Sequence, residues 1–363
     1  MISVLTTPAE LAAYDTWITS HPEGSLWQSL EWKQFQESLG REVRIYAQKE
    51  GAQILASALV VIDRTSLGLA TWDMPRGPLQ DLGLRTKDLG LLLEKIVSDA
   101  KQDSCLCLYF SPAKLITNNQ KPITSSRHEQ PVATRILDLT QSEEDILKQM
   151  KPKGRYNITV AKKNGVTIED SKDIDAFYAL AKSTGERDQF GILPKRHYEA
   201  FLNNLPGSFL LLARSPSDPN PITAQPEIRN QKSETSHAQS SKLPTAPLRT
   251  GSAQSSPIAA FLGVAWNGRA YYYYGASDHA FRALMAPYAL QWEAMTRCKA
   301  AGCVSYDLLG ISPPEAPATH PWAGVGVFKE KFGGNVVLYP PEQQIVLRPV
   351  MQAMLRMKRR MVG

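Results

Sequence analysis

The sequence predicts an α/β protein built from two similar domains in tandem. Its length of 363 residues is more than one hydrophobic core comfortably supports and suits two domains. Hydrophobic residues make up 43% of the chain and charged residues 21%, as in an ordinary soluble globular protein. One order of helices and strands occurs twice along the chain, which indicates a duplicated α/β unit.

The first copy of this order begins with two helices. Thr7, Pro8 and Glu10 form the pattern of a capping box with proline in the first turn, which opens a helix over 8–20. A second helix is expected near 30–39. Apolar spacing predicts a further helix, and alternation predicts strands. The strands are Val43–Gln48, Ile54–Ile62, Leu69–Met74 and Cys105–Phe110, with the helix near 87–102 before the last of them.

The second copy repeats the order helix, helix, three strands, helix, strand. Its helices are expected near 173–184, 196–204 and 284–301, and its strands at Phe209–Ala213, Ile258–Trp266, Ala270–Ala276 and Val304–Leu309. This order fits the acyltransferase fold of the GNAT type. We therefore expect an α/β (α+β) protein with tandem duplicated GNAT-like domains, the first formed by 1–131 with 335–363 and the second by 132–334.

Two segments fall outside this repeat. Residues 215–257 are rich in Ser, Pro, Gln and Thr and contain almost no large apolar residue, so we expect a disordered loop inserted within the second domain. Residues 142–165 predict a further helix with an acidic start and a basic continuation. Its basic residues are Lys148, Lys151, Lys153, Arg155, Lys162 and Lys163.

Charge and cysteine usage bound the partners and the compartment. The net charge of +6 favours polyanions such as RNA, phosphorylated precursors or the inner membrane surface, although it also serves solubility. The basic segment 351–361 leaves the same choice open between a membrane or RNA contact and a solvated tail. The four cysteines form no CxxC pair, and no secretion signal or membrane-length apolar run is found. We expect a cytoplasmic protein with reduced thiols.

Short motifs run in a fixed order along nearly the whole chain. They are Gln28–Trp32, Pro75–Pro78, Ile136–Leu139, Lys153–Ile158, Glu186–Arg187, Tyr271–Ser277, Ala286–Trp292, Tyr306–Ile311 and Val327–Gly334. Together they resemble the Fem-type (FemABX) family of peptidoglycan aminoacyltransferases, in its compact form without a coiled-coil arm. The resemblance implies transfer of an amino acid from aminoacyl-tRNA to the stem-peptide amine of a peptidoglycan precursor, either lipid II or UDP-MurNAc-peptide. It implies no metal or organic cofactor, and the armless form makes a monomer the expectation.

Aminolysis of an ester needs a nearby amine, a stabilised oxyanion and a path for the proton of the amine. Lys329, beside Phe328, is the first catalytic candidate, because a lysine held by apolar neighbours places a fixed charge where the oxyanion develops. The resemblance indicates the same lysine. An idle solvated lysine is the alternative.

The resemblance also implies residues that bind the precursor. Tyr272 and Tyr274 alternate along a strand, share one face and match positions that line the precursor pocket, although alternating tyrosines also bury rings in ordinary cores. Tyr198 matches a further tyrosine of this pocket, and we add Asp307 from the motif Tyr306–Ile311. A basic residue for the phosphates is expected near Tyr198, and the options are Lys195, Arg196 and Arg187.

One position departs from the family pattern. Gln36 stands where a family member has a phosphate-binding lysine, and a glutamine carries no charge. Lys33 or Arg76 are the expected replacements. Two other functions therefore stay open: an N-acyltransferase using acyl-CoA or acyl carrier protein, and a non-catalytic protein that binds precursor or RNA. The sequence lacks the Gln/Arg-x-x-Gly-x-Gly/Ala loop that holds coenzyme A, which weighs against the first.

Overall fold

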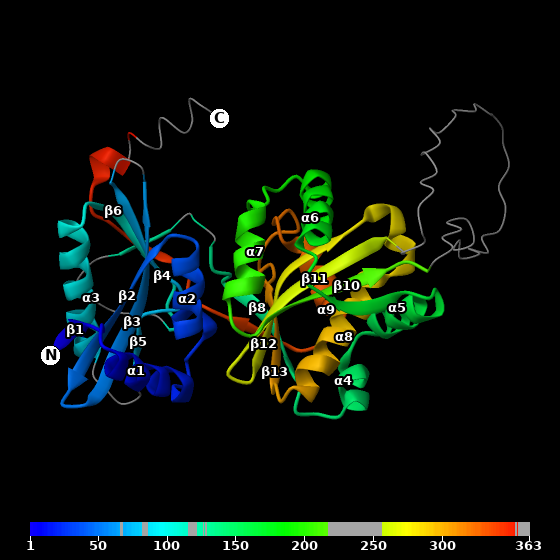
Figure 1. The fold of residues 1–363 in the computed structure, drawn as a ribbon, viewed down its shortest axis with the longest axis horizontal. Helices are drawn as coiled ribbons and strands as arrows, with labels where there is room; N and C mark the ends of the chain where they lie inside the picture. Colours follow the sequence, from blue (N-terminus) through cyan, green and yellow to red (C-terminus); the bar gives the residue numbers. More distant parts are fainter. Residues whose placement is uncertain are drawn as a thin grey trace.

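The computed structural model describes residues 1–65, 68–81, 86–114, 122–125, 127, 129–216, 256–352 and 354. Residues 217–255 of the expected inserted loop and the basic residues after 354 lie outside this part of the chain. The described residues form two mixed sheets side by side, and helices cover their faces (Figure 1).

The first half follows the predicted order closely. Its elements are β1 (Ile2–Val4), α1 (Pro8–Ser20), η1 (Leu26–Gln28), α2 (Leu30–Ser38), β2 (Glu42–Glu50), β3 (Gln53–Arg64), β4 (Ala70–Met74), β5 (Leu79–Gln80), α3 (Thr86–Gln102), β6 (Cys105–Phe110) and β7 (Ile123–Thr124). The capping box is confirmed, because the Thr7 hydroxyl accepts a hydrogen bond from the Glu10 amide while the Glu10 carboxylate accepts one from the Thr7 amide.

The second half also keeps the predicted order. Its elements are β8 (Ala133–Asp138), α4 (Glu143–Gln149), α5 (Pro152–Lys163), β9 (Thr167–Ser171), α6 (Ile174–Asp188), α7 (Lys195–Asn204), β10 (Ser208–Arg214), β11 (Pro257–Trp266), β12 (Arg269–Ser277), η2 (His279–Leu284), α8 (Ala286–Ala300), β13 (Ser305–Gly310), α9 (Ala323–Glu330), β14 (Asn335–Leu338) and β15 (Gln343–Val346). The single helix expected over 142–165 is wrong. Two helices form there, because Met150 and Lys151 are extended before Pro152 begins a new helix.

The two sheets share one topology. The first has the order β1-β2-β3-β4-β6-β15-β7, with β5 paired to β3, and the second has the order β14-β8-β13-β12-β11-β10-β9. Each contains a parallel pair at the equivalent place, β4 with β6 and β12 with β13, whereas the neighbouring pairs are antiparallel. The duplicated α/β fold expected from the sequence is therefore present.

The two halves exchange one strand. The place beside β6 in the first sheet is taken by β15, from the end of the chain, and the equivalent place beside β13 in the second sheet is taken by β8. The chain returns to the first sheet between Leu338 and Gln343, because β14 still pairs with β8. The division of the chain into domains at 131/132 and 334/335 remains a proposal. Because β14 pairs with β8 of the second sheet, we place the second boundary after Leu338.

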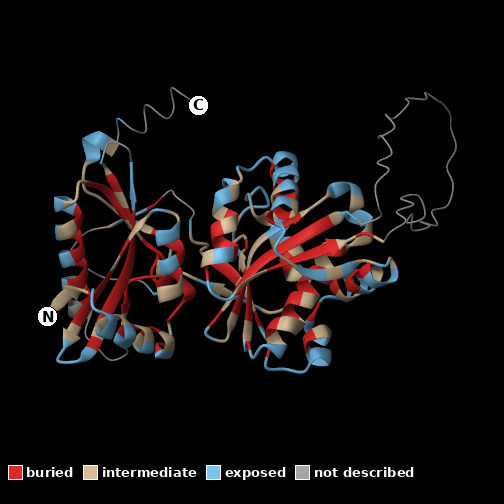
Figure 2. Cartoon of the chain, viewed as in Figure 1, coloured by how far each residue is buried: buried red, intermediate tan, exposed pale blue. Residues whose placement is uncertain are grey.

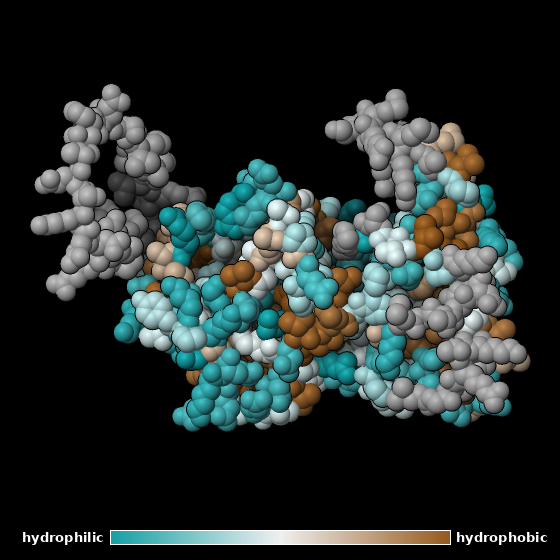
Figure 3. All heavy atoms as spheres, turned by 180° about the vertical axis from the view of Figure 1, so that it is seen from behind, coloured by the Kyte–Doolittle hydropathy of each residue, from teal (hydrophilic) through white to brown (hydrophobic). Residues whose placement is uncertain are grey.

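One hydrophobic cluster joins the halves. It contains Phe35 of α2 and Leu59 of β3 together with Phe201 of α7 and Leu262 of β11. Figure 2 shows the buried residues concentrated along both sheets and on the inward sides of the helices. On the rear face, a hydrophobic area lies near the middle of the molecule, and the surface of the second half is mostly hydrophilic (Figure 3). Among the described residues, no helix is both long and apolar enough to span a membrane.

Candidate active site

The second sheet opens along its parallel pair. Strands β12 and β13 pair at Arg269 with Ser305, at Ala270 with Tyr306 and at Tyr271 with Asp307, and the pairing then ends. In the first sheet, the equivalent strands β4 and β6 stay paired to their last residues, Met74 and Phe110. The split is therefore a feature of the second sheet, and it begins directly after Tyr271 and Asp307.

A bend in β13 shapes one wall of this split. Leu309 has φ 57°, which is unusual for a branched apolar residue, and its amide donates a 2.7 Å hydrogen bond to Asp307 Oδ1. The pairing with β8 shifts register over the same stretch. A side chain at Gly310 would clash with the Trp322 ring, 2.9 Å from an ideal Cβ. The bend thus brings the bare backbone of Gly310 to the site.

Lys329 meets this bend from α9. Its side chain is buried, and Nζ donates a 2.7 Å hydrogen bond to the Gly310 carbonyl oxygen. Nζ also lies 5.6 Å from the centre of the Tyr272 ring, a cation–π distance. The neighbouring Phe328 packs its ring against Tyr288, which anchors the helix that carries Lys329. Lys329 is therefore buried, and the alternative of an idle, solvated lysine does not describe it.

Lys329 and Asp307 influence each other within this buried site. Burial lowers the pKa of Lys329 to about 8, and the negative charge of Asp307 acts in the opposite direction. Burial raises the pKa of Asp307 to about 6, while the Leu309 amide and the cations Arg76 and Lys329 oppose that rise. The arrangement places an ammonium with a single backbone acceptor, rather than a contacting carboxylate, at the open edge of two strands.

The tyrosine run of β12 does not alternate as predicted. Tyr274 pairs with Leu262 and Tyr272 with Gly263, so Tyr273 is an extra residue in a β-bulge. Tyr272 packs on the α8 side of the sheet, whereas Tyr273 and Tyr274 pack on the side that faces the first half. The expectation that Tyr272 and Tyr274 share one face is wrong, because the bulge inverts the alternation.

Tyr274 and Tyr198 meet on the side of the sheet toward the first half. Their rings are in edge contact, with centroids 5.0 Å apart, and a 2.9 Å hydrogen bond joins Tyr274 Oη to His197 Nε2. His197 also lines a cavity of about 380 Å³ with Arg196 of α7 and Arg41 of the first half. Burial, with Arg41 nearby, lowers the pKa of His197 to about 4, so its ring is neutral at physiological pH.

Two of the three cations predicted near Tyr198 are already engaged in ion pairs. Lys195 forms ion pairs with Asp175 and Glu199, and Arg187 pairs with its neighbour Asp188. Arg196 has no ion pair within the described residues, so it is the option of the three that remains available beside Tyr198.

Arg76 lies at the crossing of the two chain segments that exchange strands. Its guanidinium donates a 2.8 Å hydrogen bond to the Pro131 carbonyl oxygen and stacks 3.6 Å from the centre of the Tyr339 ring. Burial lowers its pKa, and Nε has no hydrogen-bond partner among the residues that the structure describes. These contacts place Arg76 near Asp307 and away from the cavity beside Tyr198.

Comparison with known proteins decides the family. The model of the FemAB family matches residues 9–134, 122–216 and 211–358, which together span most of the chain. The chain belongs to the FemAB family. Similar sequences include a lipid II:glycine glycyltransferase of Staphylococcus aureus, 22% identical over 374 residues that cover 88% of this chain and 87% of the relative. The same protein of the bovine strain RF122 is 23% identical with the same coverage.

Solved structures agree on the fold. A crystal structure of FemX matches with a TM-score of 0.73 and 16% identity, covering 98% of this chain and 99% of that one. A tandem GNAT protein from the clavulanic acid biosynthesis pathway matches with a TM-score of 0.50 and 10% identity, covering 96% and 98%. Both likenesses confirm the duplicated GNAT-like architecture of this FemAB protein.

The structure adds a cation that sequence reasoning missed in this FemAB protein. Gln36 is buried in α2, and its Oε1 accepts a 2.6 Å hydrogen bond from Arg41 Nη1. Gly40, with φ 80°, ends α2 in a tight turn that folds Arg41 back over Gln36. A glycine just before an arginine at a helix end was the available signal. Arg41 Nε also pairs with the exposed carboxylate of Asp63 at 3.4 Å, while its Nη1 brings a positive charge to the place where Gln36 has none.

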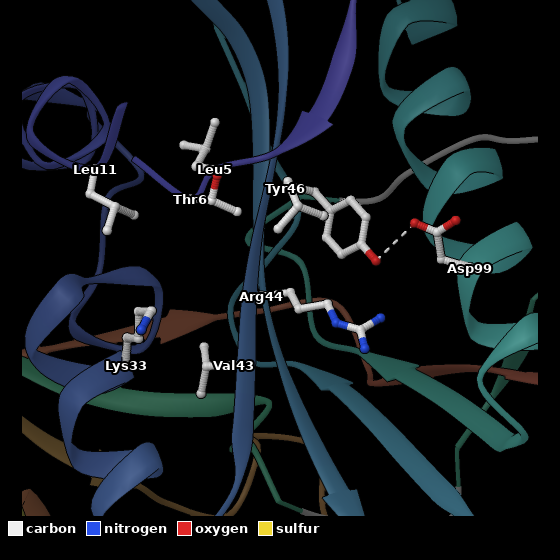
Figure 4. A pocket seen from close by; sticks show the side chains of 9 residues that line it. Leu5, Thr6, Leu11, Lys33, Val43, Arg44, Tyr46 and Asp99 are labelled. Atoms are coloured by element: carbon white, nitrogen blue, oxygen red, sulfur yellow. Dashed lines mark hydrogen bonds between the residues drawn. The ribbon is translucent and has the colours of Figure 1, made fainter. Parts of the chain in front are cut away.

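Lys33 does not supply this charge. It pairs with Glu37 at 2.5 Å and lines a separate cavity at the edge of the first sheet. Figure 4 shows Lys33 and Leu11 on one side of β2 and Tyr46 with Asp99 on the other. The residues that line this cavity are therefore divided by the strand. Arg41, rather than Lys33 or Arg76, lies with Gln36.

Proposed function

We propose that this FemAB protein transfers an amino acid from aminoacyl-tRNA to the stem-peptide amine of a peptidoglycan precursor, lipid II or UDP-MurNAc-peptide, and so contributes to an interpeptide bridge. The observation that carries the proposal is the buried ammonium of Lys329 at the split between β12 and β13. The curated relatives named lipid II:glycine glycyltransferase support the acceptor class.

The proposed reaction is ester aminolysis. The nitrogen of the acceptor amine forms a bond to the carbonyl carbon of the aminoacyl ester, and the carbonyl oxygen becomes an oxyanion. The tetrahedral intermediate then collapses, the bond to the ribose oxygen breaks, and the proton lost by the amine ends on that oxygen. Lys329 stabilises the oxyanion by its charge, which is stronger in a buried site than in water.

Asp307 has a supporting role in this scheme. Its charge raises the pKa of Lys329 against the effect of burial, and so keeps the ammonium protonated near neutral pH. Phe328 and the bend at Leu309 fix the two partners of the Lys329 hydrogen bond. These residues position the catalytic ammonium.

The acceptor side of the proposed site is the cavity between the halves. Arg41 and Arg196 line it, and Tyr198 and Tyr274 lie beside it. The lining also includes Arg64 and the carboxylates of Glu42 and Asp63, of which Glu42 pairs with Arg64 and Asp63 with Arg41. Two guanidinium groups suit the diphosphate that both precursor forms carry. We therefore propose that Gln36 and Arg41 together replace a phosphate-binding lysine.

The donor side favours RNA over coenzyme A. In GNAT enzymes a glycine-rich turn at the start of the central helix holds the pyrophosphate of coenzyme A. Here η2 and the start of α8, residues 279–287, contain no glycine, and a proline stands in the first turn of α8. The glycine-rich turn is therefore lacking at this place.

The test is transfer of radiolabelled amino acids from a total charged tRNA pool to a mixture of lipid-linked and nucleotide-linked precursors. Label on one precursor, lost in Lys329→Ala, is the expected result. Label on neither precursor, together with saturable binding of coenzyme A, would instead support an acyl-CoA-dependent enzyme. Binding of tRNA and precursor by a folded protein without any transfer would support a non-catalytic role.

A further inference from the structure

Helix α5 presents a basic outer face that the proposed site does not use. The helix contains no acidic residue, and its buried side, Gly154, Asn157, Ile158 and Ala161, is turned toward α8 and the rest of the second half. Lys153, Lys162 and Lys163 are exposed and have no ion pair within the part of the chain that the structure describes.

An exposed aromatic ring lies among these cations. The side chain of Tyr156 is 59% exposed, and Lys153 Nζ lies 5.5 Å from the centre of its ring. A tyrosine that packs against no core exposes a ring face to solvent at a cost in hydration, which a stacking partner would recover. We name Lys153, Tyr156, Lys162 and Lys163 the α5 face.

The α5 face is rigidly connected to the helix of Lys329. The Lys151 amide donates a 3.1 Å hydrogen bond to the Lys331 carbonyl oxygen, and Lys151 Nζ pairs with Glu330 at 2.5 Å. Gly154 packs so closely on Lys331 that an added Cβ would stand 2.3 Å from its carbonyl oxygen. The start of α5 is therefore fixed to Glu330 and Lys331, the two residues that follow Lys329 in the chain.

We propose that the α5 face binds the sugar–phosphate backbone and a base of the donor RNA close to its aminoacylated end. This inference rests on the proposed function. Lys329 packs with Tyr272 on the α8 side of the second sheet, which is also the side of α5, whereas Tyr198, Tyr274 and Arg41 lie on the other side. Donor and acceptor then reach the split from opposite faces of the sheet and do not compete for space.

The composition of the α5 face favours RNA over a lipid surface. Helices that lie in a membrane interface bury large apolar residues such as Trp, Phe or Leu. The exposed residues of α5 are instead Lys151, Pro152, Lys153, Tyr156, Thr159, Lys162 and Lys163, which offer no apolar anchor beyond one ring. Cations interleaved with an aromatic ring match the chemistry that holds single-stranded nucleic acid.

The experiment compares a triple variant, Lys153→Gln with Lys162→Gln and Lys163→Gln, against a matched control. The control is Lys101→Gln with Lys172→Gln and Lys182→Gln, which removes three exposed lysines away from α5. Binding of an uncharged RNA hairpin with a single-stranded 3′ end is measured by fluorescence anisotropy over a series of salt concentrations. Transfer kinetics with charged tRNA are measured on the same proteins, and circular dichroism checks folding.

The expected result is that the α5 variant weakens RNA binding and lowers the slope of log K against log salt by about two to three, since each lost phosphate contact removes about one unit. The KM for charged tRNA rises while kcat is little changed, and the control matches the wild type. Tyr156→Ala weakens RNA binding by about fivefold or more without changing the salt slope, because it removes stacking and no charge.

Three outcomes overturn the inference. If wild-type protein transfers label and the α5 variant keeps its KM for charged tRNA, the face is not the donor site although the proposed function stands. If the variant loses binding to vesicles of anionic phospholipid but keeps RNA binding, the face is a membrane contact. If wild-type protein neither transfers label nor binds RNA, the proposed function fails, and the inference fails with it.

Discussion

Replacement of Lys329 by alanine should lower kcat by about 10²-fold or more, the usual effect of losing one oxyanion stabiliser. The structure supports a decrease larger than this minimum. Lys329 Nζ is buried and contacts a backbone carbonyl oxygen rather than a carboxylate, so most of its charge is available to the reacting carbonyl. Burial has already removed most of the water around the ammonium. The ammonium therefore loses little further solvation when the substrate closes the split.

The pH dependence gives a sharper test than the alanine variant. With a pKa of about 8, the ammonium is roughly 90% protonated at pH 7 and roughly 10% at pH 9. The contribution of Lys329 to kcat/KM should therefore fall about tenfold per pH unit above pH 8. In Lys329→Arg the guanidinium stays charged over this whole range, so the fall should disappear even if the overall rate is lower.

The assay is initial-rate transfer from charged tRNA at several pH values, analysed as the ratio of wild type to Lys329→Arg. Deprotonation of the acceptor amine and hydrolysis of the ester affect both proteins equally and cancel in this ratio. A ratio that stays flat between pH 7 and 9 would refute the assignment of the alkaline fall to Lys329. A folded Lys329→Ala protein with unchanged kcat would remove the residue from the mechanism.

Three further predictions follow from buried contacts. Asp307→Asn should remove a pH-dependent loss of stability. Because the pKa of Asp307 is raised in the folded protein, the protonated carboxyl stabilises the fold fully below about pH 4. This stabilisation, at most about 3 kcal/mol, is lost as the pH rises through about 6. Denaturant unfolding at pH 4 and pH 8 measures this, and the alkaline fall in activity should move to lower pH, because Lys329 loses the charge that raises its pKa. Arg41→Gln should raise the KM for a diphosphate-bearing precursor by about tenfold or more with kcat little changed. Gln28→Ala should lower the free energy of unfolding by about 3 kcal/mol or more, because three backbone hydrogen bonds of its buried amide are lost.

Each of these predictions would be refuted by a specific result. Equal losses of stability between pH 4 and 8 in wild type and Asp307→Asn would show that Asp307 is not the titrating group. Lys33→Gln is the matched control for Arg41→Gln, since Lys33 lies in the separate cavity, and an equal effect of both variants would exclude a specific phosphate site. An unfolding free energy of Gln28→Ala close to wild type would mean that water replaces the lost amide.

Local patterns were enough to predict the repeated helices and strands of the two halves. The capping box at Thr7 and the alternation in Val43–Gln48 depend on residues close in sequence, and both signals were correct. The sequence places 335–363 in the first domain, but it does not predict which strands are exchanged. β8 and β15 are short strands with ordinary residues, and their choice of partner depends on contacts about 170 and 235 residues away along the chain.

The site was predicted where a residue type alone is informative and missed where geometry decides. Lys329, which directly follows the apolar Phe328, was such a type, and its side chain is buried in the structure. The bulge at Tyr273 inverted the expected faces of the tyrosines, because one extra residue shifts every later side chain by one place. Arg41 was missed because only a turn at Gly40 brings it back to Gln36.

The two halves differ at their equivalent parallel strand pairs, β4 with β6 and β12 with β13. In the first sheet, Arg127 crosses between the strands near the end of the parallel pair, with Nη2 at 2.8 Å from Asp73 of β4 and 2.9 Å from Glu342 just before the exchanged strand β15. Its ion pairs close the same region that is open in the second sheet, where Lys329 lies. In the first sheet β4 and β6 stay paired to their last residues, so the split exists in the second sheet, while the first half contributes Arg41, bonded to Gln36, to the cavity between the halves. In the proposed reaction the first half would hold the acceptor through Arg41, and the open second sheet would perform the transfer through Lys329.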